Sequence, residues 1–186
     1  KKIYKFQDKN DYLVVNKRML KRVQHDVVCE AKSRIILFAI ENVPLKIRKN
    51  FKLPGEHNLE NLAGAYMAAK TMGISDMIIG NAVRNFKGVQ FRLEKIAEIN
   101  GVTYINDTTS TTPIATIMAL RAFAGKPIIL ICGGSSKNLE MTDLAKEIRK
   151  RVKAVVLLEG TATDGIGKSL KAMPAGRQVA KFQSLK

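Results

Sequence analysis

Short apolar runs, several of them alternating with polar residues, predict a series of β-strands along the chain. The predicted strands are residues 1–7 (KKIYKFQ) and 11–17 (DYLVVNK) around the turn-like DKND, then 34–40 (RIILFAI), 101–105 (GVTYI), 127–134 (PIILICGG) and 154–160 (AVVLLEG). Between residues 91 and 107, the Asn100-Gly101 pair is a strong short-range signal for the turn of a β-hairpin.

Apolar residues at helical spacing, with turn and capping signals at their ends, predict helices between these strands. The predicted helices are residues 59–72, which Gly73 ends, 75–86, 113–124, 141–150 and 164–172. In the second half of the chain, strands and helices alternate, which predicts an α/β fold with a mostly parallel sheet and right-handed crossovers. A joint near Lys87 to Arg92 separates two units, and residues 18–32 show no clean period.

Composition adds limits to this picture. With 186 residues and 46% hydrophobic residues, the chain can bury a substantial core. Cys29 and Cys132 lack metal-ligand spacing, and no apolar run reaches the roughly 18 residues needed to span a bilayer. We therefore expect a cytoplasmic protein without a metal site or membrane contact in this chain. Because the first residue is Lys, we also expect the sequence to begin inside a longer chain.

The net charge of +16 raises the possibility of nucleic-acid binding. The Lys and Arg residues are scattered, however, and no aromatic interleaving or nucleic-acid motif accompanies them. The pattern favours a solvated basic surface, or one that attracts an anionic phosphate substrate, over a nucleic-acid groove.

A polar cluster lies between the strand at 101–105 and the helix at 113–124, in the stretch YINDTTSTTPIATIMAL. In an open α/β sheet, ligands bind beyond the carboxyl ends of the strands, and a helix N-terminus attracts phosphate or carboxylate. The alternative is structural, since Thr111 or Thr112 could cap the helix while Asp107 closes a turn. The residues alone leave both interpretations open.

Other motifs have similar alternatives. In GEHNLEN, Asn58 and Asn61 share a helix face and could bind a nucleobase edge, unless Asn58 is only the N-cap. In GGSSK, glycines permit close backbone approach and Lys137 could hold an anion. The stretch DGIGKS lacks P-loop spacing and is better interpreted as a turn at a helix start.

Four motifs in this order, LPGEHNLENLAGAYMAA, FKGVQFRLE, GVTYINDTTSTTPIATIMAL and ILICGGSSKNL, resemble the Mur ligase family, and in particular its D-glutamate-adding branch. The resemblance covers residues 53–160, and DYLVVNK extends it upstream. It implies the end of a central ATPase-type α/β domain in residues 1–90, followed by a truncated Rossmann-like C-terminal domain in 91–186. The implied reaction is ATP-dependent: the substrate carboxylate is phosphorylated, and the amine of the incoming amino acid attacks the acyl phosphate.

For the nucleotide, the resemblance implies that Asn58 and Asn61 contact the adenine and that Asp107 accepts hydrogen bonds from the ribose hydroxyls. Arg92 would meet the ATP phosphates and act in catalysis. For the substrates, Thr109 and Thr111 would line the same loop. Lys137 would hold the carboxylate of the incoming amino acid and, like Arg92, act in catalysis.

The implied partners are a UDP-linked muramoyl substrate and D-glutamate, in a full-length enzyme expected to be monomeric. The Gly-rich ATP loop and the Mg²⁺ ligands are expected outside this chain, so we expect the chain alone to be inactive. Two positions depart from the family pattern, which has His where Phe91 stands and often Lys where Thr109 stands. The segments 17–32 and 173–186 match nothing in the family.

Two alternatives stay open at this point. One is another Mur-type or a folylpolyglutamate-type ligase, which would differ in the amino acid added. The other is a non-catalytic, basic nucleotide-binding or nucleic-acid-binding module, favoured only by the charge.

Overall fold

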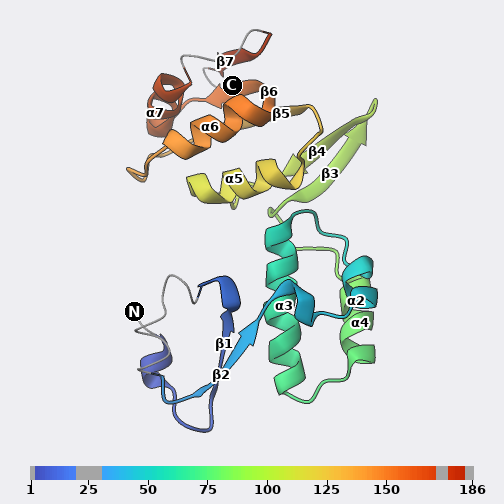
Figure 1. Cartoon of the computed structure of the whole chain (residues 1–186). Coiled ribbons are helices and arrows are strands. Elements are labelled where there is room, and N and C mark those ends of the chain that lie inside the picture. The colour runs from blue at the N-terminus through green and yellow to red at the C-terminus, as the bar shows by residue number, and fades with distance from the viewer. Residues whose placement is uncertain (1–2, 20–30, 171–175, 183–186) are drawn as a thin grey trace. The chain divides into compact units, whose positions relative to one another are not determined.

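A computed structural model describes residues 3–19, 31–170 and 176–182, and it confirms an α/β protein whose strands pair mostly in parallel. The chain divides into two compact units, Lys1–Lys87 and Gly88–Lys186 (Figure 1). The boundary expected from the sequence lies three residues later, at 90/91. Residues 20–30, including Cys29, lie outside the described residues, as does part of the segment 173–186.

Unit 1 combines one parallel strand pair with helices. Its elements are η1 (Ile3–Phe6), β1 (Tyr12–Asn16), β2 (Arg34–Phe38), η2 (Ile40–Asn42), α2 (Leu45–Asn50), α3 (Glu56–Thr71) and α4 (Asp76–Asn85). The predictions for β1, β2, α3 and α4 are confirmed, although α3 begins three residues earlier than predicted, and α2 was not predicted. The predicted strand at 1–7 is wrong, because residues 3–6 form one turn of 3₁₀-helix. A short apolar run is compatible with one helical turn as well as with a strand, so the sequence pattern alone could not distinguish the two structures.

The core of unit 1 lies between helices. Its buried residues come mainly from α2, α3 and α4 and from the connection before α2: Val43, Ile47, Leu62, Ala63, Tyr66, Ile79 and Val83. Tyr66 also donates a hydrogen bond from its hydroxyl to Asp76 at 2.9 Å, which joins α3 to the first turn of α4. Lys70 forms an ion pair with the same carboxylate at 2.9 Å.

Unit 2 contains a hairpin and a separate parallel sheet. Its elements are β3 (Glu94–Ile99), β4 (Val102–Asn106), α5 (Pro113–Ala122), β5 (Ile128–Gly133), α6 (Thr142–Arg151), β6 (Val152–Leu158), α7 (Thr161–Ser169) and β7 (Gln178–Phe182). The hairpin prediction is confirmed: β3 and β4 pair antiparallel, and Asn100 and Gly101 both have positive φ, as a type I′ turn requires.

The parallel sheet has the order β5-β6-β7, so each crossover helix follows its strand in sequence. The sequence analysis did not predict β7, and in the structure β4 pairs with β3 instead of joining this sheet. The predicted helices α5, α6 and α7 are confirmed, although α7 begins three residues early. That shift places the whole DGIGKS stretch inside α7, so its interpretation as a turn is wrong.

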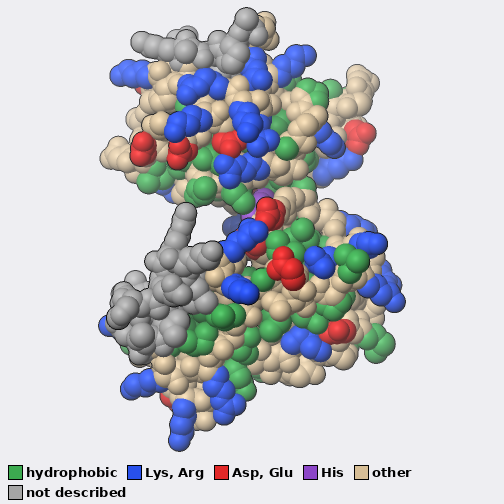
Figure 2. Space-filling view, viewed as in Figure 1, with side chains coloured by type: hydrophobic (Ala, Val, Ile, Leu, Met, Phe, Trp, Pro, Cys, Tyr) green, Lys and Arg blue, Asp and Glu red, His purple; other side chains and the backbone are tan. Residues whose placement is uncertain are grey.

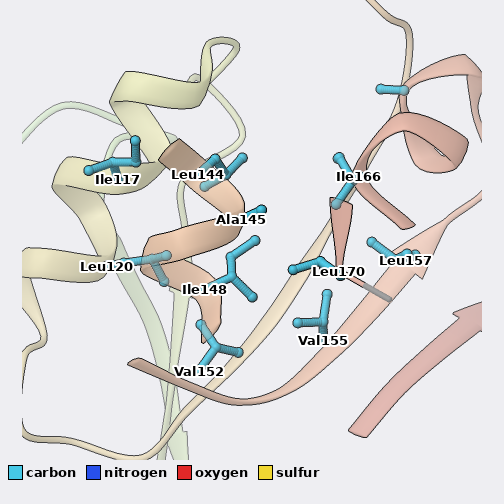
Figure 3. Close-up of a cluster of buried hydrophobic side chains, with 11 residues drawn as sticks. Ile117, Leu120, Leu144, Ala145, Ile148, Val152, Val155, Leu157, Ile166 and Leu170 are labelled. Atoms are coloured by element: carbon cyan, nitrogen blue, oxygen red, sulfur yellow. The ribbon is translucent and has the colours of Figure 1, made fainter. Parts of the chain in front are cut away.

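The core of unit 2 lies between this sheet and its helices (Figure 3). Its buried residues are Ile117 and Leu120 of α5; Leu144, Ala145 and Ile148 of α6; Val152, Val155 and Leu157 of β6; and Ala162, Ile166 and Leu170 from α7 and its C-cap. Burying each large apolar side chain stabilises the fold by roughly 1.5–3 kcal/mol. This packing therefore sets the position of β5, which Lys137 follows, and of α5, which follows the β4–α5 connection.

The opposite face of the sheet is open. Ile129 and Ile131 of β5 are each 63% exposed, whereas Ile128, Leu130 and Cys132 alternate with them and pack against the core. The strand register places Ala154 and Val156 of β6 beside this exposed row. Parallel sheets are usually covered on both faces. In this sheet, the alternation along β5 separates a face that packs against the core from a face that is exposed. No helix among residues 3–19, 31–170 and 176–182 is long and apolar enough to cross a membrane.

Candidate functional site

The candidate residues lie on one helix of unit 1 and on three segments between the elements of unit 2. Asn58 and Asn61 lie on the first two turns of α3 in unit 1. In unit 2, Arg92 precedes β3 and Lys137 follows β5, while Asp107, Thr109 and Thr111 lie between β4 and α5.

The two asparagines of α3 have different environments. Asn58 is 5% exposed, and its side-chain Nδ2 donates a hydrogen bond to the Pro54 carbonyl at 2.7 Å. Asn61 is exposed. The interpretation of Asn58 as the N-cap is wrong, because Gly55 takes that position with a φ of 95°, a conformation that favours glycine. The Asn58 amide joins the Pro-Gly turn to the helix, whereas the Asn61 side chain forms no hydrogen bond with the residues that the structure describes.

The β4–α5 loop, residues 107–112, shows that the structural interpretation of its polar residues is at least partly right. Thr112 caps α5, accepting a hydrogen bond from the Ala115 N–H at 3.4 Å, and Pro113 occupies the first helical position. Asp107 closes a turn, since its carbonyl accepts the Ser110 N–H at 2.9 Å and its Oδ2 accepts the Ser110 hydroxyl. Thr111 is exposed at the mouth of the helix.

The same loop holds the backbone on both sides of Arg92. Asp107 Oδ1 accepts the Leu93 N–H at 3.0 Å, and Thr109 donates both its N–H and its hydroxyl to the Phe91 carbonyl, at 3.2 and 2.8 Å. The structure therefore brings Arg92, Asp107 and Thr109 together at the base of the hairpin. Because its hydroxyl hydrogen is already donated, Thr109 can offer a ligand only acceptor lone pairs.

Phe91 and Leu93 both have left-handed backbone conformations, with φ of 63° and 46°. For residues with a Cβ this conformation costs roughly 1–2 kcal/mol each, and such outliers often occur at functional sites. Glu94 helps to hold this segment, because its Oε2 accepts the Phe91 N–H at 2.8 Å. Sequence reasoning missed the contributions of Glu94 and Ser110.

The β5–α6 loop, residues 134–141, is shaped by close backbone approach. A Cβ on Gly133 would lie 2.5 Å from the Leu158 carbonyl oxygen, and one on Gly160 would overlap the carbonyl of Gly134. Thr161, at the start of α7, accepts the Ser136 N–H at 2.8 Å, a contact that the sequence pattern did not indicate. This arrangement fixes the backbone just before Lys137, whose side chain is exposed.

The basic side chains near these two loops differ from those between the helices of unit 2 in whether they form ion pairs. Among the residues that the structure describes, no carboxylate forms an ion pair with Arg92 or Lys137. Arg121 and Arg151, by contrast, both bind Glu147. Burial alone would raise the pKa of Glu147, but hydrogen bonds from the two arginines, together with their charges, lower it. The structure thus separates cations used for packing from cations available to an anionic ligand.

The Cys132 thiol is not suited to act as a nucleophile. Burial raises the pKa of the Cys132 thiol to about 11, so this cysteine is protonated and unreactive near neutral pH. Within the described part of the chain, no cluster of three or more His, Cys, Asp or Glu residues could hold a metal ion. On the face shown in Figure 2, Lys and Arg are spread widely rather than gathered in one groove.

Comparison with known proteins identifies relatives of both units. The family model of the Mur ligase glutamate ligase domain matches residues 91–186. The UDP-N-acetylmuramoylalanine–D-glutamate ligase of Roseiflexus sp. (strain RS-1) is 49% identical over 124 residues, which cover 67% of this chain and 26% of the relative. This chain therefore spans about a quarter of the length of that relative.

Solved structures share the fold across nearly the whole chain. MurF from Acinetobacter baumannii has a TM-score of 0.73 at 15% identity, covering 98% of this chain and 44% of that one. MurF ligase from Thermotoga maritima in complex with ADP has a TM-score of 0.58 at 15% identity, covering 97% of this chain and 51% of that one. At such low identity these two structures support the fold alone, whereas the family model covers more than half of the chain. The chain belongs to the Mur ligase family.

Proposed function

We propose that this chain is part of an ATP-dependent ligase that adds D-glutamate to UDP-N-acetylmuramoyl-L-alanine in peptidoglycan precursor synthesis. The substrate carboxylate attacks the γ-phosphorus of ATP, which releases ADP and forms an acyl phosphate. The amine of D-glutamate then attacks the acyl carbon, phosphate leaves, and an amide bond forms. The 49% identity to a ligase of that name supports the choice of substrates.

The observation that carries the reaction class is a pair of exposed cations, Arg92 before β3 and Lys137 after β5, neither of which forms an ion pair among the residues that the structure describes. ATP, the acyl phosphate and the carboxylates of both substrates are anionic, and a positioned cation stabilises charge that develops on a transferring phosphoryl group. Arg92 binds the ATP phosphates, and Lys137 binds the carboxylate of the incoming amino acid. Both contacts orient the reactants, which is where most of the rate enhancement of phosphoryl and acyl transfer can arise.

The remaining residues bind the nucleotide and line the site. Asn61 and Asn58 contact the adenine, with Asn61 as the more available amide because Asn58 already donates to Pro54. Asp107 accepts hydrogen bonds from the ribose hydroxyls through its remaining lone pairs. Thr109 and Thr111 line the loop that faces the substrates. The ligase acts in the cytoplasm as a monomer. Mg²⁺, held by ligands outside this chain, screens the phosphate charge, and the chain alone forms no amide bond.

A chimera can test this proposal in a full-length enzyme. The segment of the Roseiflexus ligase that aligns with this chain is replaced by this chain's own residues, and phosphate release is measured with ATP, UDP-N-acetylmuramoyl-L-alanine and D-glutamate. Lys137→Ala is expected to raise the KM for D-glutamate by about ten- to a hundredfold and to leave the KM for ATP nearly unchanged, because a charge-assisted hydrogen bond to the carboxylate is lost. Arg92→Ala is expected to lower kcat/KM for ATP instead.

Matched controls make the outcome specific. Lys146→Ala removes an exposed cation on α6 that is already paired with Asp143, and it should change neither parameter. L-Glutamate, L-lysine and D-alanyl-D-alanine replace D-glutamate in parallel assays. If one of these supports turnover and D-glutamate does not, the proposed substrate is wrong. If Lys137→Ala and Arg92→Ala affect the same substrate equally, the proposed division of roles is wrong.

A further inference from the structure

We propose that Glu94, Asp107 and Thr109 form a clamp that positions Arg92, so that Asp107 and Thr109 act through Arg92 in addition to any contact with nucleotide or substrate. The clamp is defined by these three residues. The proposal rests on the proposed function only for the identity of the ligand that Arg92 meets, the ATP phosphates. The backbone geometry stands by itself.

The first step is that three consecutive N–H groups around Arg92 are all bound. The Phe91 N–H donates to Glu94 Oε2 at 2.8 Å, the Arg92 N–H donates to the Val89 carbonyl at 3.2 Å, and the Leu93 N–H donates to Asp107 Oδ1 at 3.0 Å. Two of the three acceptors are carboxylates, and hydrogen bonds to ionised groups are the stronger kind. Each of the three backbone N–H groups of this segment therefore has an acceptor within unit 2.

The second step concerns the two left-handed residues that flank Arg92. Residues with a Cβ rarely adopt that conformation, and here Thr109 supplies two donors to the Phe91 carbonyl. If the clamp is removed, Phe91 and Leu93 can relax to ordinary backbone angles. Such a relaxation turns the Cα–Cβ bond of Arg92 to a new direction, because Arg92 lies between them.

The third step is that the clamp fixes the Arg92 backbone without neutralising its charge. No carboxylate of the clamp forms an ion pair with the guanidinium, which stays exposed. A structural loop would not need to hold an unpaired cation between two strained residues, whereas a phosphate-binding arginine gains from being aimed before the ligand arrives.

Thr109→Val in the chimera described above is the sharpest test, because it removes the hydroxyl and keeps the shape of the side chain. We expect kcat/KM for ATP to fall about three- to tenfold, as the loss of one neutral hydrogen bond predicts, with the KM for D-glutamate unchanged. Thr109→Ser should restore most of the activity. Thr108→Val is the matched control on the neighbouring exposed threonine and should have no effect.

A double-mutant cycle separates positioning from direct contact. If Thr109 acts through Arg92, Thr109→Val should have little further effect in the Arg92→Ala background. An undiminished effect in that background would overturn the clamp, since Thr109 would then touch the substrate itself. The clamp is also overturned if Thr109→Val leaves kcat/KM for ATP unchanged in an active chimera.

Amide hydrogen exchange, measured on this chain, tests the clamp without an assay of enzymatic activity. Glu94→Gln should speed exchange of the Phe91 amide by about tenfold or more, because its charged acceptor is lost, and should leave the amides of the parallel sheet unchanged. Glu98→Gln, on the same strand and paired with Lys95, is the control and should leave Phe91 unaffected. An inactive chimera would contradict the proposed function alone, whereas unchanged exchange at Phe91 would contradict the clamp alone.

Discussion

The β4–α5 loop and the β5–α6 loop occupy similar places in unit 2, each between a strand and a helix, yet they are built differently. Side chains shape the first: Asp107 and Thr109 bind neighbouring backbone, and Thr112 caps α5. Glycines shape the second, where Gly133 and Gly160 let backbone segments approach too closely for any Cβ.

This difference shows why polar motifs after strands are ambiguous. The residue types that suggest a ligand site are the same types that build a loop, so the pattern alone cannot separate the two uses. The two loops resemble each other in what they present: each lies beside an exposed cation with no ion pair among the described residues, Arg92 in one case and Lys137 in the other. A basic side chain without an ion pair therefore separates a ligand-binding interpretation of these loops from a structural one better than the number of their polar residues does.

The largest expected effect comes from adding one methyl group at Gly160, the N-cap of α7, which packs against Gly134 at the start of the β5–α6 loop. Gly160→Ala should destabilise unit 2 by about 3 kcal/mol or more, because the new Cβ overlaps the Gly134 carbonyl in a backbone conformation available mainly to glycine. The free energy of unfolding, measured by urea titration and circular dichroism, checks this value.

Gly125→Ala is the matched control for that measurement. Gly125 has a φ of 84° and no atom within 4 Å of an added Cβ, so only backbone strain of about 1 kcal/mol is expected. Equal losses for the two variants would mean that the close approach does not shape the β5–α6 loop.

An intermediate effect is expected where the helices that follow the two loops are joined. Glu147 of α6 accepts hydrogen bonds from Arg121 of α5 and from Arg151, both at 2.6 Å. Glu147→Gln should destabilise unit 2 by about 1.5–2 kcal/mol near pH 7, because it weakens two charge-assisted hydrogen bonds and leaves arginines unpaired. Thermal unfolding of both proteins across a pH series measures the difference.

The pH dependence has a definite sign. Burial opposes ionisation of Glu147, but the two arginines lower its pKa in the folded state below the usual 4.5. Its contribution is therefore fully present above that value and is lost as the pH falls through the lowered pKa. The wild-type and Glu147→Gln proteins should converge in stability at acid pH. Asp143→Asn, at an exposed ion pair on the same helix, should neither lower the stability near pH 7 nor show a difference from wild type that disappears at acid pH.

The smallest effect on stability is expected at Thr112, the N-cap of α5 at the end of the β4–α5 loop. Thr112→Ala removes the acceptor for the Ala115 N–H and should cost about 1 kcal/mol, while Thr112→Ser should cost little. The same urea titration detects both. If Thr112→Ala proved as damaging as Gly160→Ala, the distinction between a loop built by side chains and one built by glycines would not hold.

Much of the fold was predictable because its signals are local. The Asn100-Gly101 turn requires positive φ at both positions. The continuous apolar run of β5 indicates a strand, but it suggests burial on both faces and does not indicate that Ile129 and Ile131 are exposed. Strand β7 was missed because Gln178–Phe182 is short and lacks an apolar run, so that its pairing with β6 is set by tertiary structure.

The sequence indicates which loops carry the candidate residues, but it does not indicate the hydrogen bonds that these residues form. The sequence indicates that Asp107 and Thr109 follow a strand and precede a helix, and it supports both a ligand-binding and a structural interpretation. It cannot indicate that Phe91 and Leu93 are left-handed, because neither residue type prefers that conformation. Only the packing of the hairpin base against the β4–α5 loop produces it.

The contact between Gly160 and the Gly134 carbonyl has a consequence for how this protein can change over generations. Every amino acid that a single base change can produce from a glycine codon carries a Cβ, so no one-step mutation preserves the contact. An aspartate codon, by contrast, lies one base change from both asparagine and glutamate, which keep an oxygen acceptor at position 107. Single mutations can therefore change the β4–α5 loop while they keep an oxygen acceptor at position 107. The backbone beside Lys137 can change only if the Gly160–Gly134 contact is lost or if several mutations occur together.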